Sequence, residues 1–167
     1  MSNDMTKGDI KKIEEEIEYR KLVVRKEAIE AVKEARAQGD LSENFEYYAA
    51  KRDKNKNESR IRYLERLVKT ANIIEDDTKA DEVGLYSVVS LYMEEDEEEM
   101  TVKLVTSIRG DSMKGYISID SPLGSAIKGH KAGDRVYVEV SKDYGYYVRI
   151  KKIEQTEDDG SDDIRSY

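Results

Sequence analysis

The sequence predicts an α+β protein, with an N-terminal antiparallel helical hairpin of the coiled-coil type and a C-terminal antiparallel β domain that carries one short helix. Residues 9–77 lack proline and repeat apolar side chains every three or four positions, whereas later segments alternate and are rich in β-branched residues and tyrosine. Charged residues make up 40% of the chain and hydrophobic residues 38%, which suits a long exposed element joined to a small compact domain. We expect the hairpin over residues 1–78, the β domain over 79–154 and an acidic, disordered tail over 155–167.

Two amphipathic stripes predict the helices of the hairpin. The first stripe comprises Ile10, Ile13, Ile17, Val24, Ala28, Ala31 and Ala35, and the second comprises Ile61, Leu64, Leu67, Ala71 and Ile74. Gly39 is a typical helix end and Asp40 a typical helix start, so the two helices should run antiparallel. The stripes weaken to alanine toward this turn, which predicts a thin polar tip.

Five short runs predict the strands of the β domain. Turn residues separate them: the acidic run Glu94–Glu99 reads as a hairpin loop, and Asp143–Gly145 as a second turn. Ser121 followed by Pro122 predicts the capped start of a short helix. The predicted strands are Leu85–Met93, Met100–Thr106, Tyr116–Ile119, Arg135–Val140 and Tyr146–Ile153.

Asp40 and Glu43 form the main candidate for chemistry. Their spacing lets both carboxylates face one point, where they could hold part of the shell of a Mg²⁺ ion or orient a water molecule. The same spacing is that of a helix capping box, and spacing alone favours the cap. Two carboxylates do not complete a magnesium shell, so a metal role requires ligands from a partner.

A basic segment follows the predicted tip. Residues 51–69 contain eight lysines and arginines against three acidic residues. Such a helix can contact the phosphates of a single strand, although a solvated helix face explains it equally well. The whole chain has a net charge of −8, all of it in residues 80–167, which argues against general coating of DNA.

Several other classes of protein are disfavoured. The chain contains no cysteine, which excludes disulfides and thiolate chemistry. No apolar run approaches the ~20 residues of a membrane helix, and the charged first residues do not resemble a secretory signal, so we expect a cytoplasmic protein. The one histidine, His130, lies in a turn-rich stretch that reads as a surface loop.

Two segments resemble one known family. The stretch Glu34–Tyr47, which reads EARAQGDLSENFEY, resembles the tip signature of the Gre transcript-cleavage factors, GreA and GreB. The stretch Ser121–Val136, which reads SPLGSAIKGHKAGDRV, resembles the signature of their C-terminal domain. The two occur in the right order, and the resemblance covers roughly residues 5–153, with a weak preference for GreA.

The resemblance implies a function that neither composition nor spacing supplies. It implies an FKBP-like C-terminal domain that docks at the rim of the secondary channel of RNA polymerase, while the hairpin reaches the active site. There Asp40 and Glu43 would help to hold a second catalytic Mg²⁺ and the attacking water, and the polymerase would cleave the 3′ end of backtracked RNA. The free protein would then be a monomer that needs no cofactor and is not itself an enzyme.

The resemblance also assigns roles to further residues. Those matching the RNA-contacting patch are Arg36 and Arg52, with Lys51, Lys54 and Lys56 as helpers. The residues expected to support the tip are Asn44, Phe45 and Tyr47. The residues expected to dock on the polymerase are Ser121, Pro122, Gly124, Gly129 and Gly133.

This sequence departs from the family pattern at two tip positions. Phe45 stands where a small residue is usual, and Tyr48 where histidine is common. Two alternatives stay open: a channel-binding regulator without cleavage activity, and a coiled-coil adaptor or chaperone with an FKBP-like domain.

Overall fold

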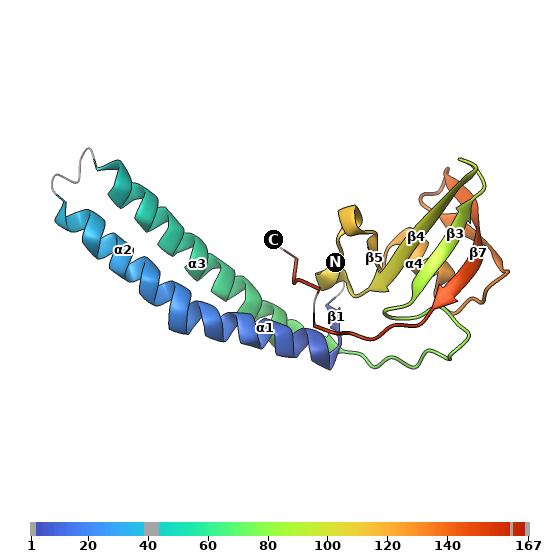
Figure 1. Ribbon diagram of the computed structural model, residues 1–167, viewed down its shortest axis with the longest axis horizontal. Helices are drawn as coiled ribbons and strands as arrows, with labels where there is room; N and C mark the ends of the chain where they lie inside the picture. Colours follow the sequence, from blue (N-terminus) through green and yellow to red (C-terminus); the bar gives the residue numbers. More distant parts are fainter. Residues whose placement is uncertain (1–2, 39–43, 161, 166–167) are drawn as a thin grey trace. The chain divides into compact units, whose positions relative to one another are not determined.

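The computed structural model describes residues 3–38, 44–160 and 162–165 and divides into two compact units (Figure 1). One unit spans residues 10–71 and holds the helical hairpin. The other unites the first nine residues with residues 72–166 and holds the β structure. The predicted hairpin domain of residues 1–78 therefore includes two segments that belong with the β unit.

The hairpin consists of one long interrupted helix and one continuous helix. Its first limb runs through α1 (Lys7–Tyr19), the π-helical segment η1 (Arg20–Val24) and α2 (Arg25–Ala37), and its second limb is α3 (Phe45–Thr70). The two limbs run antiparallel, with α2 packed along α3 (Figure 1). No helix of the described ranges is long and apolar enough to cross a bilayer.

The interior of the hairpin changes from apolar to polar along its length. Ile61, Leu64 and Leu67 of α3 are buried, as the stripe predicted. Ile74 was also placed in that stripe, but α3 ends at Thr70 and Ile74 packs against the core of the β unit. Further along the limbs, charged groups take over, and Arg25 donates to both carboxylate oxygens of Glu58 at 2.8 Å.

The π-helical segment η1 has a specific polar partner on α3. Arg20 donates from Nη1 to Oδ1 of Asn57 at 3.0 Å, and Nδ2 of Asn57 donates to the carbonyl of Arg20 at 3.3 Å. The same carbonyl accepts from the backbone N–H of Arg25, as a π-helical turn requires, so the Asn57 amide is a second donor to it. Asn57 is only 4% exposed, which makes it part of the interior of the hairpin.

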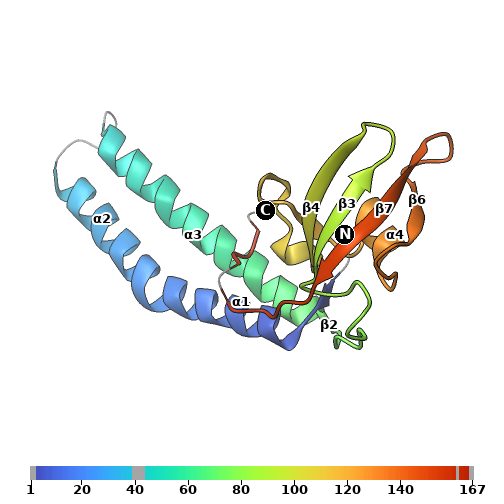
Figure 2. The ribbon, with the colours of Figure 1, turned by 45° about the vertical axis from the view of Figure 1, so that its right-hand side comes forward.

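The β unit contains a five-stranded sheet in the order β5-β4-β3-β7-β6 (Figure 2). All neighbours are antiparallel except β4 and β5, which are parallel, so the predicted antiparallel sheet is mixed at one edge. A separate parallel pair joins β1 to β2. The strands are β1 (Asp4–Met5), β2 (Asn72–Ile73), β3 (Val88–Met93), β4 (Glu98–Val105), β5 (Tyr116–Ser118), β6 (Arg135–Glu139) and β7 (Gly145–Glu154).

Alternation along the strands builds the core of this unit. Val89 and Leu91 of β3, like Val148 and Ile150 of β7, point to the same buried cluster. The short helix α4 (Pro122–Ile127) contributes Leu123 and Ile127 to that cluster and contacts β6 and β5. The predicted α+β class, with a hairpin followed by a sheet and one short helix, is confirmed.

The prediction of a disordered tail is wrong for the described residues beyond 154. Ile164 is 8% exposed and Asp162 is 3% exposed, so both are buried. The backbone N–H of Arg165 donates to the carbonyl of Ile108 at 2.7 Å, in the 3₁₀ turn η3 (Ser107–Arg109). Acidic composition suggested solvation, but specific cationic partners on the β unit hold this segment in place.

Candidate functional site

Asn44 joins the two helix ends that flank the predicted catalytic segment. It is the N-cap of α3, where its Oδ1 accepts from the backbone N–H of Tyr47 at 3.0 Å. Its Nδ2 donates to the carbonyl of Ala35, in the last turn of α2, at 2.7 Å. One amide therefore caps one helix and holds the end of the other, while its predicted role in tip support stays a prediction.

The predicted catalytic and magnesium-binding pair, Asp40 and Glu43, lies within residues 39–43, outside the described residues. The helix that the sequence placed from Asp40 begins instead at Phe45, and Asn44 takes the capping position. The alternative in which Asp40 caps the second helix is therefore wrong. The chemical role of Asp40 and Glu43 stays a prediction.

A cationic group surrounds Tyr47 on one side of the hairpin. Arg36 donates from Nη2 to the Tyr47 hydroxyl at 3.4 Å, and its guanidinium carbon lies 5.5 Å from the ring centroid. The hydrogen bond from Arg36 lowers the pKa of Tyr47, helped by the positive charges of Arg36, Lys51 and Lys54. Three of the five predicted RNA-binding cations, Arg36, Lys51 and Lys54, thus cluster around one tyrosine.

The other two predicted cations lie on a different face of α3. Arg52 and Lys56 line a shallow hollow of about 580 Å³ together with Tyr48, Asn55 and Ser59. Tyr48 is 48% exposed, so its ring offers a stacking surface beside these two cations. The sequence predicted both cations as RNA contacts but not the tyrosine one turn before them, although helical spacing places residues 48, 52 and 56 in one row.

Phe45 and the acidic side of the hairpin complete this end of the molecule. The Phe45 side chain is 84% exposed, so it does not brace the helices.

A second hollow, of about 530 Å³, is floored by alanines of α2 and α3 and edged by acids that would repel phosphates. Those acids are Glu27, Glu34, Glu46 and Asp53.

The predicted polymerase-docking residues have clear roles in building the β unit. Ser121 caps α4 by accepting from the N–H of Gly124 at 3.0 Å, and Pro122 occupies the first turn, both as predicted. A Cβ on Gly124 would lie 2.0 Å from the carbonyl oxygen of Ser118, so only glycine fits there. Gly129 and Gly133 adopt φ angles of 83° and 94°, in the left-handed region. These structural roles explain why each residue type occupies its position without any reference to docking. Docking to the polymerase stays a prediction.

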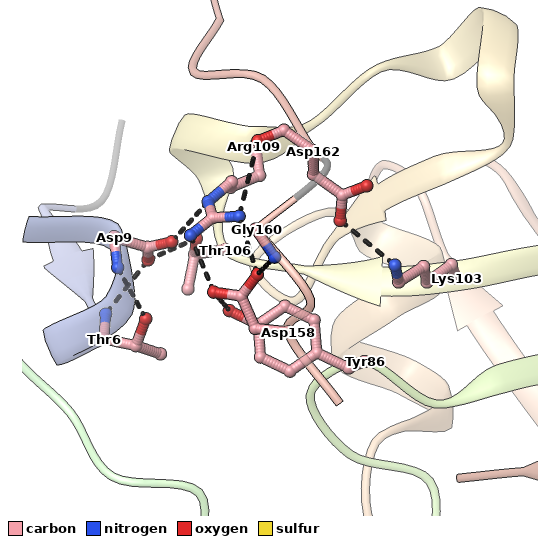
Figure 3. Close-up of polar contacts among 9 residues, drawn as sticks. All are labelled: Thr6, Asp9, Tyr86, Lys103, Thr106, Arg109, Asp158, Gly160 and Asp162. Carbon is pink, nitrogen blue, oxygen red and sulfur yellow. Dashed lines mark hydrogen bonds and ion pairs between the residues drawn. The ribbon is translucent and has the colours of Figure 1, made fainter. Parts of the chain in front are cut away.

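A buried ion-pair cluster, which the sequence did not predict, lies in the β unit (Figure 3). Arg109 is 1% exposed and donates from Nε to Oδ1 of Asp9 at 2.6 Å. Its Nη2 and Nη1 donate to the two carboxylate oxygens of Asp158 at 2.8 and 3.1 Å. Burial alone would lower the pKa of Arg109, but the hydrogen bond with Asp158 and the charges of Asp9 and Asp158 outweigh it and raise the pKa.

Neighbouring groups complete the hydrogen bonding of this cluster. The hydroxyl of Thr106 and the backbone N–H of Thr6 both donate to Oδ2 of Asp9, at 2.7 and 3.0 Å. The Tyr86 hydroxyl lies 3.4 Å from Oδ2 of Asp158, and burial raises the pKa of Tyr86 to about 12, so it stays protonated as a donor. The available sequence signal was a single arginine three residues after the predicted strand Met100–Thr106, together with an acid-rich segment far along the chain.

No group of three or more His, Asp or Glu residues within the described ranges is arranged to hold a metal ion. The carboxylates of the Arg109 cluster are committed to the guanidinium, not to a cation site. The predicted magnesium ligands are Asp40 and Glu43 alone, and their donor type suits Mg²⁺ while their number does not fill its shell.

Both halves of the chain match models of one protein family. Residues 3–73 match the model described as transcription elongation factor, N-terminal. Residues 77–155 match the model described as transcription elongation factor, GreA/GreB, C-term. The buried acidic segment beyond residue 155 therefore lies outside both matches.

Curated relatives agree with these matches. The transcription elongation factor GreA of Thermoanaerobacter pseudethanolicus is 46% identical over 137 residues, which cover 81% of this chain and 87% of that protein. GreA of Bacillus subtilis is 41% identical over 135 residues, covering 81% and 86%. The crystal structure of the GreA factor homolog Gfh1 of Thermus thermophilus is 27% identical, covers 92% of this chain and 99% of that chain, and has a TM-score of 0.42. On the family models and the GreA relatives, this chain belongs to the GreA/GreB family of transcription elongation factors.

Proposed function

We propose that this chain binds RNA polymerase through the secondary channel and stimulates cleavage of the 3′ end of backtracked RNA. The observation that carries the proposal is the family match over both halves of the chain, at residues 3–73 and 77–155. The chain itself is a monomeric accessory factor and not a nuclease, and it acts in the cytoplasm, where a bacterial polymerase works.

In this proposal, Asp40 and Glu43 supply what the polymerase lacks for fast hydrolysis. Their carboxylates accept hydrogen bonds from the attacking water, orient it toward the phosphate and add to the ligands of a shared Mg²⁺. The metal supplies charge stabilisation at the phosphate and a more acidic water. Asn44 supports this arrangement because it fixes the helix ends on both sides of residues 39–43.

The two cationic faces of the hairpin hold the RNA in this proposal. The hollow of Tyr48, Arg52 and Lys56 offers one ring for stacking and two charges for phosphates. Arg36, Lys51 and Lys54 form the second contact around Tyr47. The acid-edged hollow lined by Glu34 and Glu46 lies on a different face of α3 and would repel the strand.

The test is RNA cleavage in a stalled, backtracked polymerase complex with Asp40→Ala and Glu43→Ala. Each variant should lower the stimulated cleavage rate about 100-fold or more, since general acid–base and positioning effects of this kind have that size. Polymerase binding, measured by pull-down, should persist. Glu46→Ala is the matched control, because it removes an exposed acid from the first turn of α3 and should leave cleavage unchanged. Full cleavage by both tip variants would refute the proposal.

A further inference from the structure

The C-terminal strap, defined here as residues 156–160 and 162–165, lies over two cations of the β unit. Asp158 makes the paired hydrogen bonds to Arg109, and Asp162 accepts from Nζ of Lys103 at 3.0 Å (Figure 3). The strap lies beyond the family match, which ends at residue 155. It is therefore a feature that the proposed function does not use.

The two cations are held in place by the body of the β unit and not by the strap alone. Arg109 keeps its bond to Asp9 through Nε, which leaves the two terminal nitrogens of the guanidinium directed at the strap. The ammonium of Lys103 lies 5.1 Å from the ring centroid of Tyr116 and 5.8 Å from that of Tyr86. Since a fixed guanidinium fork and a ring-supported ammonium need little reordering, they form a prepared site for two carboxylates.

The strap makes further contacts through groups that a peptide has and a nucleic acid lacks. The N–H of Arg165 pairs with the carbonyl of Ile108, and the side chain of Thr156 donates to the carbonyl of Tyr86. Ile164 is 8% exposed, so the groove accepts an apolar side chain close to the second carboxylate. A nucleic acid strand supplies neither a backbone amide nor an aliphatic side chain, and the net negative charge of residues 80–167 would repel it.

We propose that the groove of Lys103 and Arg109 is a docking site for an acidic peptide segment of a partner protein, and that the strap occupies it as a tethered competitor. The segment it fits carries two carboxylates four residues apart, followed by an aliphatic residue, as Asp158, Asp162 and Ile164 do here. A hollow of about 730 Å³ adjoins the strap at Asp163–Arg165 and is lined by Ser107, Ser118 and Lys114, which leaves room for a longer bound segment.

Tethering sets the size of the expected competition. A segment attached by a short chain has an effective concentration on the order of millimolar. A free peptide with an intrinsic Kd of about 10 μM should therefore bind the intact chain about 100-fold more weakly than a chain whose strap is released. A partner segment would have to bind the groove tightly enough to overcome this 100-fold competition, or it would have to bind the strap itself.

The experiment measures binding of a fluorescent peptide with the sequence of residues 155–167 by fluorescence anisotropy. The full chain and its double variant Asp158→Asn/Asp162→Asn are compared, because the variant weakens the strap and keeps the groove. The variant should bind the peptide about 100-fold more tightly than the unaltered chain. Adding Lys103→Gln to it should weaken binding about tenfold, as expected for one charge-assisted hydrogen bond.

Controls separate groove recognition from general charge attraction and from unfolding. A peptide with asparagine in place of both aspartates should not bind, and a single-stranded RNA of equal charge should bind more weakly than the acidic peptide. Asp162→Asn alone keeps the Arg109–Asp158 pair, so it should stay folded by circular dichroism and still gain several-fold in peptide affinity. Equal binding by the unaltered chain and the folded variants, or tighter binding of the RNA, would overturn the proposal.

Discussion

The hairpin unit and the β unit use the same chemistry, the arginine–carboxylate pair, at opposite degrees of burial. In the hairpin, Arg25 and Glu58 join the two limbs with side chains that are 35% and 27% exposed. In the β unit, Arg109 and Asp9 are 1% and 0% exposed. Water can replace the first pair but not the second, so the buried pair should carry the larger energetic weight.

The largest effect is expected from Arg109→Met. The substitution leaves the buried carboxylate of Asp9 without its cation, and it should lower the free energy of unfolding by about 4 kcal/mol. Urea denaturation followed by tyrosine fluorescence measures it. Arg149→Met is the control, because Arg149 is 55% exposed and 3.6 Å from Glu94, and it should change stability by no more than about 1 kcal/mol. Similar losses for the two variants would remove the distinction between buried and exposed pairs.

Leu64→Ala tests the apolar end of the hairpin. Leu64 is 0% exposed, so the lost burial and the cavity should together cost about 3 kcal/mol. Thermal unfolding followed by helical circular dichroism measures this loss. Leu22→Ala on the first limb is the matched control, because Leu22 is 66% exposed and its truncation should be nearly neutral.

Asn44→Ala should have a smaller effect, about 1 kcal/mol, because it removes the N-cap of α3. Hydrogen exchange at the Tyr47 amide should accelerate, since that amide loses its acceptor. Asn44→Asp separates the two roles of the residue: the carboxylate still caps α3 but no longer donates to Ala35. Protection of Tyr47 should then survive, and an unchanged exchange rate in the alanine variant would contradict the capping role.

The smallest expected effect is the loss of the Arg25–Glu58 stabilisation at acidic pH. The hydrogen bond from Arg25 lowers the pKa of Glu58 below its ordinary value of 4.5. Because the folded-state pKa is the lower one, the stabilisation is fully present above pH 4.5 and is lost as the pH falls through the folded-state value. Helicity of the unaltered chain should therefore fall toward that of Glu58→Gln in acid, and added salt should reduce the difference at neutral pH.

The sequence predicted the elements whose signals are local. Three- and four-residue spacing gave both helices, alternation gave the strands, and Ser121 with Pro122 gave the start of α4. The cap of α3 was misplaced because Asp40 and Asn44 are both good capping residues, and only the three-dimensional helix start distinguishes them. The split of the predicted RNA contacts into the Tyr47 and Tyr48 faces was accessible from helical spacing, whereas the roles of Asp40 and Glu43 stay a prediction.

Local sequence patterns could not predict the ordered strap, because its partners are far from it along the sequence. Asp158 meets Arg109 across 49 positions and Asp162 meets Lys103 across 59. An acid-rich composition predicts solvation unless the positions of opposing charges are known. The same holds for η1, whose partner Asn57 lies 37 residues from Arg20.

The π-helical segment η1 determines how the first limb of the hairpin responds to a change in its length. Its wider turn is closed by bonds from residue i to residue i+5 and absorbs about one extra residue, so deleting a single residue from Arg20–Val24 would restore a regular helix and leave the direction of everything beyond it nearly unchanged. A deletion early in α2 has no such turn to absorb it: one residue there corresponds to a rotation of about 100°, so Ala35 would turn away from α3 and Arg36 away from Tyr47. The first limb should therefore tolerate the loss of one residue within η1 better than the loss of one residue early in α2.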